Sequence, residues 1–66
     1  MEPKYPEIKV QLVGTDGNAF AILAAVKRAL QKAMLDQAEI DACMNEMRAS
    51  DYNHLLATAM DWVDVQ

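Results

Sequence analysis

The five residues 14–18 read Gly-Thr-Asp-Gly-Asn and combine two glycines with three small polar side chains. A run of alternating polarity precedes them and a run with helical periodicity follows, so they are predicted to lead from a strand into a helix. The free N–H groups at the start of a helix can bind a phosphate or carboxylate, and the polar side chains add hydrogen-bonding groups. The sequence therefore predicts a ligand-binding loop. Its members are Gly14, Thr15, Asp16, Gly17 and Asn18.

The same loop also fits a purely structural role. Gly14 and Gly17 can take the positive φ angles of a tight turn. Thr15, Asp16 or Asn18 can then cap the following helix by accepting hydrogen bonds from its first N–H groups. The loop is not a P-loop, because no Gly-Lys-Ser/Thr follows, and its glycines lack the spacing of a dinucleotide-binding fingerprint. Both interpretations, a ligand-binding loop and a turn, stay open at the level of the sequence.

His54 is the second candidate for a ligand-binding residue. Asp51 precedes it by three residues and Thr58 follows it by four, so all three lie on one side of a predicted helix. No further ligands with metal-site spacing accompany them, and no nucleophile is paired with the imidazole, so we predict neither a metal site nor a catalytic residue. His54 is expected either to hydrogen-bond a helix cap or the opening loop, or to join that loop in a polar pocket.

The elements that position these residues follow from hydrophobic periodicity. Residues 7–13 alternate, with Ile8, Val10 and Leu12 on one face, which predicts a half-buried strand. From residue 19 to about residue 34 the apolar residues recur every three or four positions, which predicts an amphipathic helix. Lys27, Arg28 and Lys32 form a small basic patch near the end of this helix, and the patch is large enough for one anionic group.

Two more helices and a short strand are predicted to complete the chain. Asp36 and Glu39 have the spacing of a capping box at the start of a second helix. Ser50 or Asp51 is predicted to cap a third helix, which ends near Trp62 and carries an apolar face. The members of that face are Tyr52, Leu55, Leu56, Ala59 and Met60. Residues 63–65 alternate and predict a final strand.

The expected fold class is therefore α+β, with residues 1–6 as an extended lead-in and residues 7–66 as a single small domain. The order is strand, three helices, strand, and we expect the terminal strands to pair antiparallel with the helices packed on one face. A two-stranded sheet leaves both edges open and is marginal by itself. A chain of 66 residues also buries little core, so a homo-oligomer is expected.

Composition narrows the class of partner. The net charge of −4 argues against a general nucleic-acid binder, which usually presents a basic face. The lone cysteine, Cys43, rules out an intrachain disulfide and fits a reducing compartment. No apolar run approaches the roughly 18 residues that span a bilayer, and the start of the chain lacks a signal-peptide core. We expect a cytoplasmic protein with no cofactor, no nucleic-acid partner and no membrane partner.

Three segments resemble a family of small uncharacterised bacterial and phage proteins: VQLVGTDGNAFAIL at 10–23, DYNHLL at 51–56 and WV at 62–63. The resemblance covers nearly the whole chain and supports the domain boundaries, but it brings no known activity. One departure is residues 33–35, where a glycine is expected to end the helix. A phage context implies action by binding, including sequestration of a host signalling nucleotide or blockage of a host protein.

The predicted function is that of a small non-enzymatic binding protein. We expect a homo-oligomer that binds a small anionic or nucleotide-like ligand at the loop of residues 14–18, with His54 nearby. The alternative is a protein–protein interaction module or adaptor, such as a phage-encoded inhibitor of a host protein, with no small-molecule site. No catalytic residue set is visible that favours an enzyme.

Overall fold

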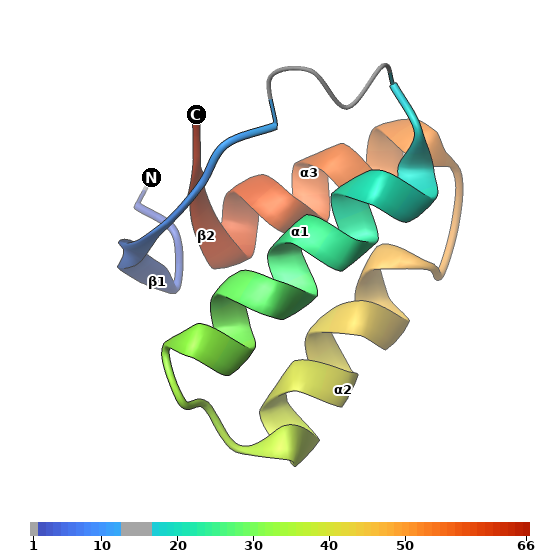
Figure 1. Cartoon of the computed structure of the whole chain (residues 1–66). Coiled ribbons are helices and arrows are strands. Elements are labelled where there is room, and N and C mark those ends of the chain that lie inside the picture. The colour runs from blue at the N-terminus through green and yellow to red at the C-terminus, as the bar shows by residue number, and fades with distance from the viewer. Residues whose placement is uncertain (1, 13–16) are drawn as a thin grey trace.

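The computed structural model describes residues 2–12 and 17–66. The elements follow in the predicted order of strand, three helices and strand. They are β1 (Tyr5–Val10), α1 (Ala19–Lys32), α2 (Gln37–Met47), α3 (Tyr52–Trp62) and β2 (Val63–Val65). Figure 1 shows the three helices packed together, with the two strands side by side at one end of the molecule. In the described part of the chain, no helix is both long and apolar enough to cross a membrane.

The two strands run parallel, so the predicted antiparallel pairing is wrong. Val10 aligns with Val65, and the Gln66 N–H donates to the Val10 carbonyl oxygen at 2.8 Å. The physical reason is the number of elements in between. The chain changes direction from each element to the next (Figure 1), and after three helices the fourth change returns β2 to the direction of β1. Parallel strands require such a long crossover connection.

The core is built from the apolar faces that the periodicity predicts. Ile8 and Val10 on β1 are buried, and each helix contributes one buried stripe. The buried helical residues are Ile22, Val26 and Leu30 on α1, Ile40, Cys43, Met44 and Met47 on α2, and Leu55, Thr58, Ala59 and Trp62 on α3. Met60 was predicted on the apolar face of α3, but its side chain is 61% exposed. Thr58 is buried on that helix instead, and its hydroxyl lies 3.3 Å from His54 Nε2.

Two of the three helices begin with a side-chain cap. Asn18 Oδ1 accepts hydrogen bonds from the N–H groups of Phe20 and Ala21, at 2.9 and 3.4 Å. Asp51 Oδ1 accepts from the His54 N–H at 2.9 Å. Each bond satisfies an N–H that has no partner within its helix. Asn18 is thus the cap of α1 among the three residues that the sequence left open, and Asp51 is the cap of α3.

Helix α2 starts without the predicted capping box. Asp36 stands at its N-cap position but makes no side-chain cap bond. The Glu39 carboxylate, which would complete the box, instead accepts a hydrogen bond from the Tyr5 hydroxyl and lies 3.0 Å from Lys4 Nζ. A long-range contact to the start of the chain therefore replaces the local one.

The start of the chain is held against α2 and α3 by an aromatic cluster, which we define as Lys4, Tyr5, Glu39 and Trp62. The rings of Tyr5 and Trp62 stack with centroids 6.1 Å apart, and Lys4 Nζ lies 4.5 Å from the Trp62 ring centroid. The Lys4 N–H also donates to the Asp61 carbonyl oxygen at 2.8 Å. Strand β1 accordingly begins at Tyr5, within the stretch that the sequence predicts as a lead-in.

This cluster predicts an acid-sensitive contribution to stability. The hydrogen bond from Tyr5, together with the contact to Lys4, lowers the pKa of Glu39, and the same bond raises the pKa of Tyr5 to about 12. A carboxylate with a lowered folded-state pKa stabilises the fold above its ordinary pKa, and this contribution is lost as the pH falls through the lowered value. The raised pKa of Tyr5 gives the opposite pH dependence. The contribution of Tyr5 to the stability of the fold is present below pH 10 and is lost as the pH rises towards 12.

We therefore expect wild type to lose unfolding free energy below about pH 4.5 more steeply than Glu39→Gln, whose amide does not titrate. Urea denaturation at a series of pH values measures the difference in slope. Glu2→Gln is the matched control, because Glu2 is an exposed glutamate near the same end of the chain. Identical slopes for wild type and Glu39→Gln would show that the cluster does not carry the acid dependence.

Candidate functional site

The predicted loop is only partly covered by the structure. Gly14, Thr15 and Asp16 lie outside the described residues. Gly17 has a φ of +70°, as the turn interpretation predicts, and a Cβ placed on it would lie 3.7 Å from the Tyr52 hydroxyl. Asn18 caps α1 with its side-chain oxygen. In the described part of this loop, both residues therefore have structural roles, and the ligand-binding role of the whole loop stays a prediction.

His54 connects α3 to the end of α2. Its Nε2 atom lies 2.9 Å from the Glu46 carbonyl oxygen and 3.3 Å from Thr58 Oγ1. Since a carbonyl oxygen only accepts hydrogen bonds, this geometry places the ring proton on Nε2. The same carbonyl oxygen, in the last turn of α2, also accepts from the Ala49 N–H at 3.2 Å, so the imidazole adds a second bond at this helix end. The sequence predicts a bond from His54 to a helix cap or to the opening loop, whereas its ring partners among the described residues are Glu46 and Thr58; its ligand-binding role stays a prediction.

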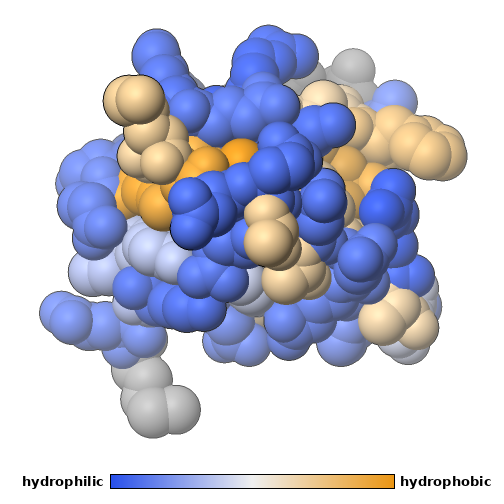
Figure 2. Space-filling view, turned by 90° about the horizontal axis from the view of Figure 1, so that it is seen from below, coloured by the Kyte–Doolittle hydropathy of each residue, from blue (hydrophilic) through white to orange (hydrophobic). Residues whose placement is uncertain are grey.

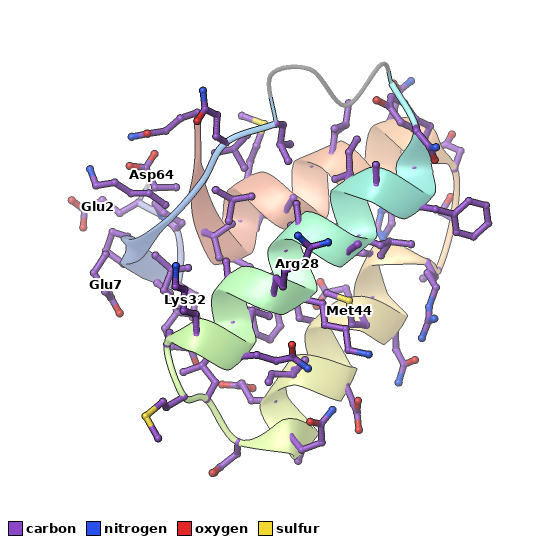
Figure 3. The ribbon with its side chains drawn as sticks, in the orientation of Figure 1. Glu2, Glu7, Arg28, Lys32, Met44 and Asp64 are labelled. Atoms are coloured by element: carbon purple, nitrogen blue, oxygen red, sulfur yellow. The ribbon has the colours of Figure 1, made fainter. Side chains whose placement is uncertain are left out.

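A groove between β1 and α1 offers a different candidate site, and we call it the basic groove. Its volume is about 670 Å³. The polar lining residues are Lys9 and Gln11 on the β1 side and Arg28, Gln31 and Lys32 on α1. Its apolar lining consists of Val10, Ala25 and Ala29. In Figure 3, Arg28 lies midway along α1, and Lys32 lies near the end of α1 closest to β1.

Simple local rules place these side chains. At the end of β1 the residues alternate between faces, so Lys9 and the following Gln11 are exposed while Val10 points into the core. Along α1, Ala25, Arg28 and Lys32 follow at intervals of three and four residues and therefore lie on one face. Alanine carries only a methyl group, so Ala25 and Ala29 leave space where longer side chains would fill the groove.

The basic groove concentrates positive charge in an acidic protein. Lys9, Arg28 and Lys32 are three of the six Lys and Arg residues in a chain of net charge −4. Lys9 Nζ lies 3.7 Å from Asp64 Oδ2, and the Lys9 side chain is 64% exposed, so this ion pair is weak. Within residues 2–12 and 17–66, Arg28 and Lys32 form no salt bridge. Their charges are thus available to an incoming anion.

The sequence identified part of this site. It indicated a basic patch of Lys27, Arg28 and Lys32, and the structure places the last two in the groove while Lys27 does not line it. Lys9 and Gln11 were missed as site residues. Their polar positions on β1 were visible in the alternating pattern, but only the packing of β1 beside α1 brings them opposite Arg28.

The described residues show little that points to metal binding or nucleophilic catalysis. Among them, no group of three or more His, Cys, Asp or Glu residues could hold a metal ion. Cys43 is buried on α2, and burial raises the pKa of its thiol to about 12. A thiol with so high a pKa stays protonated at neutral pH and is a poor nucleophile. Cys43 therefore acts as a small core residue.

Large apolar side chains on the surface are scattered. Phe20 and Met34 are 81% and 87% exposed, and they lie at opposite ends of α1. Figure 2 shows the face of the molecule seen from below, which is mainly hydrophilic and has apolar side chains in gaps between the hydrophilic ones. Single exposed apolar residues of this kind are normal on soluble surfaces. The basic groove is therefore the candidate functional site.

In the comparison with known proteins, no family model, no curated protein and no solved structure matches this chain. The resemblance to small bacterial and phage proteins stays a prediction.

Proposed function

We propose that this chain is a non-enzymatic binding protein that takes up an anionic ligand in the basic groove. One observation carries the proposal: half of the basic residues of an acidic chain line a single groove of about 670 Å³. Among the described residues, Arg28 and Lys32 have no acidic partner, and an anion would relieve the repulsion between their like charges. A concave site lined by one sign of charge also raises the local concentration of the oppositely charged ligand.

The lining residues offer complementary chemistry to such a ligand. The Arg28 guanidinium can form two parallel hydrogen bonds to a carboxylate or phosphate, and Lys32 adds a point charge one helical turn away. The amides of Gln11 and Gln31 can both donate and accept hydrogen bonds. Ala25 and Ala29 provide apolar contact for the uncharged part of the ligand. The volume lies within the range of pockets that hold drug-sized molecules.

This proposal keeps the predicted class of ligand and changes its location. The sequence placed an anionic ligand at residues 14–18 with His54, whereas the basic groove lies between β1 and α1. Asn18 is engaged in capping α1, and His54 in binding the end of α2. The groove residues Arg28 and Lys32 have no comparable structural engagement among the described residues.

Removal of the two α1 charges tests the proposal. We expect the double substitution of Arg28→Gln and Lys32→Gln to weaken binding of pyrophosphate about tenfold or more, because each charge-assisted hydrogen bond contributes about 1.5–3 kcal/mol. NMR titration at low ionic strength measures the affinity.

Lys27→Gln is the matched control, because it removes a charge from the same helix at a position that does not line the groove. We expect it to change affinity less than about twofold, through weak long-range electrostatics alone. If the control weakens binding as much as the double variant does, the basic groove is not the binding site and the proposal fails.

A further inference from the structure

One wall of the basic groove is the outer edge of β1. The Val10 carbonyl oxygen accepts from the Gln66 N–H at 2.8 Å, and the Leu12 N–H donates to the Gln66 carbonyl oxygen at 3.0 Å. Successive residues of a strand direct their N–H and C=O groups to opposite sides, so those of Lys9 and Gln11 point away from β2. Within the described residues, the Gln11 backbone makes no hydrogen bond. This edge is able to pair with a further strand.

The opposite wall of the groove is the face of α1 that carries Arg28, Gln31 and Lys32. A strand that pairs with this edge would lie about 4.8 Å from β1, on the side of β1 that borders the groove. Addition of an extended peptide to an exposed strand edge is a common mode of peptide recognition, in which backbone bonds supply affinity and side-chain contacts supply specificity.

We propose that the anionic ligand is an extended acidic peptide segment of another protein, which pairs with the outer edge of β1 and directs its carboxylates to Arg28 and Lys32. This inference rests on the proposed function, since it names the class of anion that the groove binds. The open backbone groups favour a peptide over a small inorganic anion, because a phosphate would leave the β1 edge unpaired.

The distance along α1 between the two cations matches the distance between alternate side chains on one face of a strand. Arg28 and Lys32 are four residues apart on a helix, which is a rise of about 6 Å. Alternate residues of a strand lie on the same face about 6.6 Å apart. Acidic residues at positions i and i+2 of the peptide can therefore each reach one of the two cations. Lys9, on the β1 side, is placed for a third acidic side chain.

The experiment compares two peptides and one small anion. The first peptide is an acetylated and amidated octapeptide in which Glu and Thr alternate. The second has the same sequence with every internal backbone nitrogen methylated, which keeps the charge and removes the N–H donors. Pyrophosphate is the third probe. NMR titration measures each affinity, and amide hydrogen exchange is followed at Lys9 and Gln11, with Val10 as the internal reference because its backbone faces β2.

We expect the unmethylated peptide to bind about tenfold or more tightly than the methylated one, as the loss of several hydrogen bonds predicts. It should also slow exchange at Lys9 and Gln11 relative to Val10. Equal binding of the two peptides would overturn strand pairing, and so would binding of pyrophosphate with neither peptide; both results leave the proposed function standing. If none of the three probes binds, the proposed function and this inference fail together.

Discussion

Trp62→Ala is expected to lower the free energy of unfolding by about 3–5 kcal/mol, the range for truncation of a large buried aromatic residue. Its side chain is 7% exposed at the end of α3. The ring stacks on Tyr5, lies under the Lys4 ammonium, and donates through Nε1 to Glu46 Oε2 at 3.2 Å. A single residue thus connects the start of β1 to α2 and α3.

The expected loss is comparable to the whole stability of the domain, because proteins gain only about 0.05–0.15 kcal/mol per residue. Urea denaturation followed by far-ultraviolet circular dichroism measures it, since the tryptophan fluorescence is absent from the variant. Trp62→Phe is the control that keeps a buried ring and removes the N–H donor, and we expect a smaller loss of about 1–2 kcal/mol. A loss below about 1 kcal/mol in Trp62→Ala would contradict the importance of this contact.

Met34→Gly is expected to raise the free energy of unfolding by about 0.5–1 kcal/mol. Met34 has a φ of +62°, in the left-handed region, where a residue with a Cβ is strained by roughly 1–2 kcal/mol. The turn is a Schellman motif, in which the Leu35 N–H donates to the Leu30 carbonyl oxygen at 3.3 Å and the Met34 N–H to that of Gln31 at 3.0 Å. Glycine relieves the strain, although part of the gain is offset by its greater freedom in the unfolded chain.

Thermal and urea denaturation measure this gain, with Met34→Ala as the matched control. The Met34 side chain is 87% exposed, so its truncation removes few contacts. Alanine keeps the Cβ and should therefore bring no gain. If both variants are stabilised equally, the benefit comes from removal of an exposed apolar side chain and not from the backbone. The glycine that was expected near residues 33–35 is thus replaced by a methionine in the conformation that favours glycine.

Much of the secondary structure was predictable because it depends on near neighbours. The stripe of Ile22, Val26 and Leu30 follows from the helical period, and the final strand after Trp62 follows from the alternation of residues 63–65. The Asn18 and Asp51 caps are contacts over two or three residues. The loop of residues 14–18 was also visible, but its two interpretations differ in ligand binding, and Gly14, Thr15 and Asp16 lie outside the described residues.

The relative direction of the two strands depends on the path of the whole chain and not on the local sequence of either strand. A short strand has the same alternating pattern in a parallel and in an antiparallel pair, so the sequence of β1 and β2 does not distinguish them. The path of the chain through the three helices is what makes the two strands parallel. The partners of Glu39 also depend on long-range packing. Its local sequence predicts a capping box, but its carboxylate contacts Lys4 and Tyr5, which lie more than thirty residues earlier in the chain.

The order of the elements, their apolar faces and the basic character of Arg28 and Lys32 can all be predicted from the amino-acid sequence alone. The packing of β1 beside α1 brings Lys9 and Gln11 into the same groove as those cations, and no local pattern predicts this. The two kinds of feature depend on contacts at different distances along the chain. Periodicity and caps arise from contacts within one or two turns of backbone, whereas a groove between β1 and α1 depends on how two rigid elements pack against a shared core.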